Sequence, residues 1–216
     1  MKKAVLVAVI SIVIFSFSFS TGFGKDEKDK NPLAANPDII DYFPLKVGNS
    51  WTMEDKINNG FEISTVVKEN VEFEGIKNCF EVKVEGKDID GNTTYSIYDY
   101  QKKDKDYSVS LMGSKYKDDE EWVNEKANYC ILKYPIEIGK EWIAEEDEGD
   151  ISKSKIVATN EKVIAPAGVF KNCLKIELRN NGVFNGFEWY APNVGVVKIT
   201  DEDGTTILEL KEYQIK

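Results

Sequence analysis

The sequence of 216 residues contains no histidine, and Arg179 is its only arginine. The absence of histidine excludes Ser-His-Asp and Cys-His catalysis and removes the commonest metal ligand. The 28 basic residues are outnumbered by 38 acidic ones, which gives a net charge of −10. Phosphate binding needs basic patches and favours arginine, so nucleic acid is not an expected partner. We expect neither a cofactor nor a metal.

Cysteine is sparse too, with widely separated copies at Cys79, Cys130 and Cys173. Three scattered thiols without histidine do not make a typical metal site. An exported chain permits a disulfide, and the internal repeat described below could bring Cys79 and Cys173 together. Both, however, stand in apolar segments, where a thiol packs well. We therefore expect buried and unpaired cysteines.

Residues 1–24 have the three parts of a secretory signal peptide. Two lysines follow Met1, an apolar run comes next, and small residues end the segment at Gly24. The alternative is an uncleaved membrane anchor, because the apolar run approaches the length of a membrane span. Residues 25–37 are charged and contain proline, which is typical of a disordered linker. These features predict a secreted or cell-envelope, extracytoplasmic protein.

Residues 165–198 show the pattern of β-structure most clearly. Positions 173–178 alternate between two sets of side chains, one of them entirely apolar, which is the period of a half-buried strand. The dipeptide Asn181-Gly182 follows, and it readily adopts the positive φ angles of a tight hairpin. An aromatic strand at 187–190 is then expected.

A weaker copy of this stretch occurs earlier in the chain. Residues 43–51 (FPLKVGNSW) recur as residues 134–142 (YPIEIGKEW). Residues 75–82 (GIKNCFEV) recur as residues 168–176 (GVFKNCLKI). Matches in the same order at nearly constant spacing indicate an internal duplication.

Many short strands separated by turn signals, without sustained helical periodicity, predict an all-β, antiparallel protein. Its two related halves, residues 38–133 and 134–216, are expected to form a curved sheet, a half-barrel or a sandwich. We expect the halves to make one structural unit.

Aromatic residues in the repeated strands are the candidates for a ligand-binding surface, because an apolar ligand suits an aromatic-lined concave face. They are Trp51, Tyr98, Trp142, Trp189 and Tyr190. The alternative is that Trp51 and Trp142, at equivalent turns, are core anchors. Trp122, in a charged segment, is a candidate for an exposed contact residue.

Acidic residues offer two weaker hypotheses. Glu54 and Glu145 stand three positions after the repeated tryptophans, and a carboxylate pair can hydrolyse glycosides. One glutamate per repeat is as easily structural, so we expect no catalytic residue. Segments 88–92 and 201–204 resemble fragments of calcium loops but lack the glycine and distal glutamate of an EF-hand. Both are expected to be hairpin turns.

Three segments carry a recurring set of motifs: residues 42–51 (YFPLKVGNSW), 165–174 (APAGVFKNCL) and 189–198 (WYAPNVGVVK). Together they resemble a widespread group of uncharacterised bacterial exported proteins, many of them lipoprotein-like, with the signature PAGxFxxC followed by WYAPxVGxVK. The resemblance covers most of the mature chain. It implies an envelope location and an antiparallel β fold similar to the lipoprotein-carrier half-barrel, and no catalytic residue. The chain departs from the lipoprotein members because its leader lacks a cysteine for lipid attachment.

The sequence thus favours an exported, non-catalytic cell-envelope protein that binds a hydrophobic ligand in an aromatic-lined concave face. The alternative is a cell-surface module that binds another envelope protein or a wall polymer through a sheet edge or face. A carboxylate-based hydrolase is the least favoured interpretation. A membrane contact is expected only through an uncleaved leader.

Overall fold

The computed structural model describes residues 41–102, 108–118, 121–147 and 149–216. The predicted signal peptide and linker lie outside these residues. The described chain forms a twelve-stranded sheet in which every strand pairing is antiparallel. The predicted all-β, antiparallel fold is confirmed. No helix in the described ranges is long and apolar enough to cross a membrane.

The strands follow one another through short turns. They are β1 Ser50–Asp55, β2 Gly60–Phe73, β3 Ile76–Lys87, β4 Thr93–Lys102, β5 Val109–Asp118, β6 Glu121–Leu132, β7 Glu141–Asp147, β8 Asp150–Ala165, β9 Gly168–Asn180, β10 Val183–Ala191, β11 Gly195–Thr200 and β12 Thr206–Gln214.

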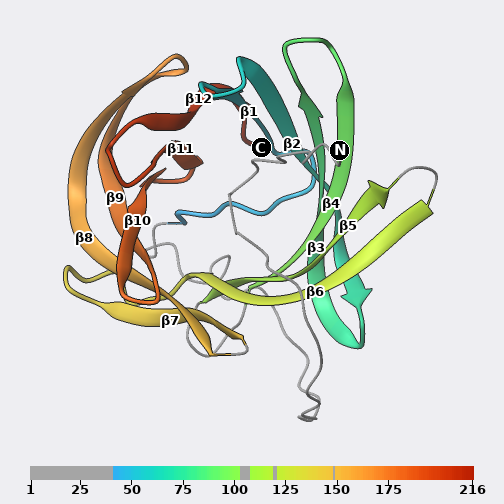
Figure 1. Cartoon of the computed structure of the whole chain (residues 1–216), viewed down its shortest axis with the longest axis horizontal. Helices are drawn as coiled ribbons and strands as arrows, with labels where there is room; N and C mark the ends of the chain where they lie inside the picture. Colours follow the sequence, from blue (N-terminus) through green and yellow to red (C-terminus); the bar gives the residue numbers. More distant parts are fainter. Residues whose placement is uncertain (1–40, 103–107, 119–120, 148) are drawn as a thin grey trace.

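Their order in the sheet is β6-β5-β4-β3-β2-β1-β12-β11-β10-β9-β8-β7. The first six strands form one meander, the last six form another, and β1 pairs with β12 where the two meet. Strands β6 and β7 are the two edges, although they are consecutive in the sequence. Figure 1 shows the sheet curled into a nearly closed ring, with β1 to β5 on one side and β8 to β12 on the other. Of the three expected architectures, the curved sheet is the one observed.

The hairpin between β9 and β10 has the predicted geometry. Asn181 and Gly182 both adopt positive φ angles, of 50° and 79°. Asn180 pairs with Val183 directly across the turn. Two positive φ angles match the twist of the flanking strands, so local chemistry accounts for this turn.

In each half, a glycine that precedes the first strand donates a backbone hydrogen bond to the second strand. The amide of Gly48 donates to the carbonyl of Val66 at 2.9 Å, and the amide of Gly139 donates to the carbonyl of Ile156 at 2.8 Å. Each bond fixes the aromatic-Pro motif of its half against the sheet. Duplication as the origin of the halves stays a prediction, which this match supports.

Residues 41–49, here called the crossing segment, run through the ring from one half to the other (Figure 1, blue). The ring of Phe43 lies 5.4 Å from that of Tyr100 on β4 and 6.5 Å from that of Tyr190 on β10. The carbonyl of Asp41 accepts a hydrogen bond of 2.7 Å from the amide of Asn193. The crossing segment therefore joins the two halves from inside.

Sequence neighbours on β9 and β10 pack in different clusters of the core. Leu174 and Tyr190 are fully buried in a cluster that draws on strands of both halves and on the crossing segment. Their sequence neighbours Cys173 and Trp189 belong to a second cluster, formed mainly by strands of the second half. This alternation is what a strand buried on both faces requires.

Candidate functional site

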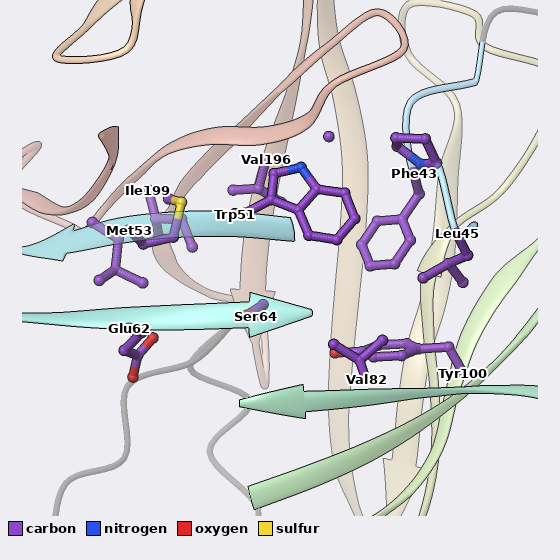
Figure 2. Close-up of a pocket in the computed structure, with 13 residues that line it drawn as sticks. Phe43, Leu45, Trp51, Met53, Glu62, Ser64, Val82, Tyr100, Val196 and Ile199 are labelled. Carbon is purple, nitrogen blue, oxygen red and sulfur yellow. The ribbon is translucent and has the colours of Figure 1, made fainter. Parts of the chain in front are cut away.

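A cavity of about 70 Å³ lies between the crossing segment and the sheet. Figure 2 shows Phe43, Trp51 and Tyr100 toward one end of it and Met53 and Glu62 toward the other. Its wall residues come from the crossing segment and six strands, namely Phe43, Pro44, Leu45, Trp51, Met53, Glu62, Ser64, Val82, Tyr100, Gly195, Val196, Ile199 and Leu208.

Trp51 is fixed by the turn between β10 and β11. Its indole Nε1 donates a hydrogen bond of 2.5 Å to the carbonyl of Val194. Gly195, with a φ of 105°, follows in that turn, and a Cβ there would lie 3.4 Å from Trp51 Nε1 and 3.7 Å from Pro44 Cδ. Glycine therefore supplies both the backbone angle and the close approach that this wall of the cavity needs.

The register of β1 and β2 aligns another wall. Ser64 lies opposite Trp51, and Glu62 lies opposite Met53. Residues two apart on a strand share a face. The four side chains consequently face the cavity from one side, and a carboxyl group joins a largely apolar lining.

Glu62 is the unusual member of this lining. Only 6% of the residue is exposed, and its Oε2 has no hydrogen-bond partner among the described residues. Burial, reinforced by the nearby Asp55, raises the pKa of Glu62 from 4.5 to about 9. At neutral pH the side chain is therefore a neutral carboxylic acid, which can donate a hydrogen bond.

Asp55 differs from Glu62 although it is also buried. Its Oδ1 accepts hydrogen bonds of 2.9 Å from the amides of Ile57 and Asn58, and its Oδ2 accepts one of 2.8 Å from the side chain of Asn58. These bonds close the turn between β1 and β2. The acceptor capacity of Asp55 is thus used by the protein, whereas that of Glu62 is not.

A second inward carboxyl group, Glu188, is satisfied by a neighbour. The hydroxyl of Tyr190 donates to its Oε2 at 2.5 Å. Burial raises the pKa of Glu188, and the bond from Tyr190 partly offsets the rise. Burial, with Glu188 beside it, also raises the pKa of Tyr190 well above its ordinary value. Neither residue lines the cavity.

The structure brings only one of the five predicted ligand-binding aromatics to the cavity, and that residue is Trp51. Tyr98 is half-buried against the core. Trp142 is buried, and its Nε1 donates to the carbonyl of Cys130 at 2.9 Å. Tyr190 is fully buried, as described above. Trp189 belongs to the second core cluster, where the Lys175 ammonium lies 4.8 Å from its ring centre.

The repeated glutamates do not meet. Glu54 on β1 forms an ion pair with Lys56 at 2.8 Å, and Glu145 lies on β7, which five other strands separate from β1 in the sheet order. Neither is a wall residue of the cavity. Trp122 lies on β6, paired with Lys117, and its side chain is outside the described part of the structure.

Sequence analysis missed Glu62. On β2 the more apolar set of alternating residues is Phe61 and Ile63, which the pattern would place inside. The structure instead leaves both half-exposed and buries Glu62. The sequence contains no signal for this choice, because Val67, in phase with Phe61 and Ile63, is as apolar as Val66, in phase with Glu62.

The cysteines carry no reactive signature. Cys79 and Cys173 are fully buried, as predicted, and burial raises the pKa of each thiol to about 11. They pack in separate core clusters of the two halves. Cys130 is half-buried, and no disulfide joins the three.

The two acidic loop segments form hairpin turns, as expected. Asp88 Oδ1 accepts the amide of Asn92 at 2.8 Å, and Asp201 Oδ1 accepts the amide of Thr205 at 2.8 Å. Among the described residues there is no group of three or more acidic or thiol side chains placed to hold a metal.

Comparisons with known proteins add little. No protein-family model matches the chain, and neither does any curated protein. Among solved structures, the chain is similar to a Bacteroides fragilis protein that is inferred to be exported and has a YmcC-like fold. The two are 17% identical, the match covers 82% of this chain and 100% of the other, and the TM-score is 0.49. At this level of similarity, no property of that protein transfers to this chain.

Proposed function

We propose that the chain is an exported, non-catalytic cell-envelope protein that holds one end of a largely apolar small molecule in the cavity beneath the crossing segment. The observation that carries this proposal is the cavity itself. Apart from Glu62, Ser64 and the hydroxyl of Tyr100, its lining is apolar. Support for export comes from residues 1–24, and support for a non-catalytic role comes from the lack of histidine.

The cavity favours an apolar occupant over water. One water needs roughly 10–15 Å³ of such space and two to four polar partners. The observed volume of about 70 Å³ exceeds that several-fold, but the wall offers few partners. An apolar group placed there gains about 25 cal/mol for each Å² removed from water.

The size of the space indicates a chain end or a small ring. A whole lipid would have to displace the crossing segment, which contributes Phe43, Pro44 and Leu45 to the wall. We therefore infer that the rest of a long ligand extends past the crossing segment.

The first test is native against denaturing mass spectrometry of the exported full chain. Extra mass that is lost on denaturation supports the proposal. Thermal unfolding with added n-decanol is the second readout, and a saturating rise of Tm is expected. Val82→Phe, which fills the cavity, should abolish the rise, whereas Val183→Phe at an exposed position should keep it. A bare mass together with no rise of Tm would refute the proposal.

The second candidate function is an interaction module, favoured by the two sheet edges. Within the described chain, β6 pairs with β5 alone and β7 pairs with β8 alone. Each therefore offers an edge that a partner strand can extend. Capture of envelope proteins on the immobilised full chain tests this candidate, because only a polypeptide can add a strand to the edge. Ile143→Lys on the exposed face of β7 should weaken such binding, and an unchanged bound fraction would argue against the edge.

A further inference from the structure

We infer that the cavity selects an apolar chain ending in a neutral hydrogen-bond acceptor, such as an alcohol, ester or carbonyl oxygen, and that Glu62 binds this oxygen as the donor. This selection rests on the proposed function, because it concerns the same cavity. It goes further by assigning the chemical class of the ligand's polar end.

The first support is the isolation of the Glu62 carboxyl group. It is 94% buried, given an exposed fraction of 6%, and Oε2 has no partner among the described residues. Buried polar groups in folded proteins are nearly always hydrogen-bonded. A buried carboxyl group in the wall of a cavity therefore indicates a partner that enters the cavity.

The second support is that the pairing partner of Glu62 on β3 offers it no side-chain hydrogen bond. This partner is Gly86, and a Cβ on Gly86 would lie 2.7 Å from Thr94 Oγ1 and 3.9 Å from Glu62 Cγ. Because Thr94 already fills that position, a larger residue at position 86 could not supply a partner for Glu62.

The third support is the set of charges around Glu62. Asp55 on β1 interacts with it electrostatically and disfavours a second negative charge. From β4, Tyr98 and Tyr100 interact with it electrostatically, and both are neutral phenols whose pKa burial raises. The cavity wall contains no lysine or arginine. A proton therefore stays on Glu62, and the group acts as a donor.

These charges also exclude two other ligand heads. An anionic head would lie close to Asp55 without any cation in the wall. A cationic head would require Glu62 to ionise in an apolar site, and desolvating both charges costs more than their attraction returns in many buried pairs. A neutral oxygen acceptor requires neither.

Three probes of equal chain length test the inference: n-decane, n-decanol and n-decylamine. Binding to the full chain is measured by the shift of Tm and by the change in tryptophan emission, since Trp51 lines the cavity. We expect n-decanol to bind about tenfold more tightly than n-decane, the effect of one buried hydrogen bond. Glu62→Leu should remove this preference while n-decane still binds.

Two further variants keep the test decisive if Glu62→Leu fails to fold. Glu62→Gln retains an N–H donor and should keep most of the preference. A further probe, 2-decanone, accepts hydrogen bonds but cannot donate one. In the wild type its preference over n-decane should fall as the pH rises through the pKa of Glu62, about 9, whereas Glu62→Gln should not change. Glu188→Gln is the matched control, since that buried carboxyl group already has Tyr190 as its partner and lies outside the lining.

The outcomes separate this inference from the proposed function. If no probe binds, the proposed function fails, and this inference fails with it. If n-decane binds as tightly as n-decanol, the cavity binds apolar chains but Glu62 does not select their polar end. Tighter binding of n-decylamine than of n-decanol would show a cation site and would also overturn the inference.

Discussion

At the scale of the residue, Glu62 makes the stability of the fold depend on pH. Burial raises its pKa from 4.5 to about 9, so between these values the folded state keeps a proton that the unfolded state loses. The contribution of Glu62 to the unfolding free energy is fully present below pH 4.5. It is lost as the pH rises to 9, by at most about 1.4 kcal/mol per pH unit. Glu62→Gln should flatten this fall, measured as urea unfolding across the same pH range.

The control for this prediction is a glutamate that the fold leaves in solvent. Glu212 on β12 is exposed, so Glu212→Gln should keep the wild-type pH dependence of the unfolding free energy. Equal slopes for the wild type and Glu62→Gln would mean that Glu62 is ionised in the folded protein. Its assignment as a hydrogen-bond donor would then be wrong.

The inward position of Glu62 could not be predicted from its own neighbours. Local alternation favours Phe61 and Ile63 as the inner pair on β2, because they are apolar. The crossing segment and β1 decide otherwise, since they place Met53 opposite Glu62. Trp51, by contrast, was found from the sequence because its motif repeats. A repeated motif identifies residues that anchor the fold. Glu62 belongs to no repeated motif, so repetition could not identify it.

At the scale of the element, the crossing segment is expected to stabilise both halves through Phe43. Its ring contacts those of Tyr100 and Tyr190 on opposite halves. Phe43→Ala should therefore lower the unfolding free energy by about 3 kcal/mol, the low end for such truncations because the residue is half-buried. It should also enlarge the cavity, so that a bulkier apolar probe binds. Thermal unfolding with and without the probe measures both effects.

A second half-buried phenylalanine supplies the comparison. Phe184 on β10 contacts Phe187, a near neighbour on the same strand, with 4.9 Å between ring centres. Phe184→Ala should cost about 1 kcal/mol and should not alter binding of the probe. A smaller loss of stability for Phe43→Ala than for Phe184→Ala would contradict the bridging role.

The repeated Lys-Asn-Cys motif makes a prediction about backbone angles. Asn78 and Asn172 have φ angles of 61° and 56°, which asparagine tolerates better than most residues. Asn172→Ala should therefore destabilise the protein by about 1 kcal/mol, whereas Asn172→Gly should be nearly neutral. The carbonyl of Asn172, which accepts the hydroxyl of Tyr42 at 3.3 Å, is present in both variants. If alanine and glycine have the same effect on Tm, the angle is not the cause.

At the scale of the whole molecule, local signals predicted the strands and turns, but not the way in which the sheet closes. Alternation and the Asn181-Gly182 turn define β9 and β10 without reference to the rest of the chain. The pairing of β1 with β12 joins residues as distant as Ser50 and Gln214, and no local pattern encodes it. Its cause lies in the curvature of both meanders and in the crossing segment between them.

Equivalent strands of the two halves differ in their number of paired neighbours, so their amides should differ in the rate of hydrogen exchange. Strand β1 follows the first aromatic-Pro motif and is paired on both sides, with β2 and β12. Strand β7 follows the second motif but is paired only with β8. Amides without a strand partner are more accessible to exchange. The amides of β7 should therefore exchange faster than those of β1, measured by exchange with mass spectrometry on the full chain.

Strand β1 is itself the control, because Trp51 and Trp142 hold matching places in the two repeats and the flanking sequences are alike. A difference in amide protection between β1 and β7 would therefore come from strand pairing, not from amino-acid composition or from position in the repeat. Equal protection would mean that β6 and β7 pair in solution and close the ring. Closure would remove the edges on which the interaction module depends, and the cavity would then be the remaining candidate site.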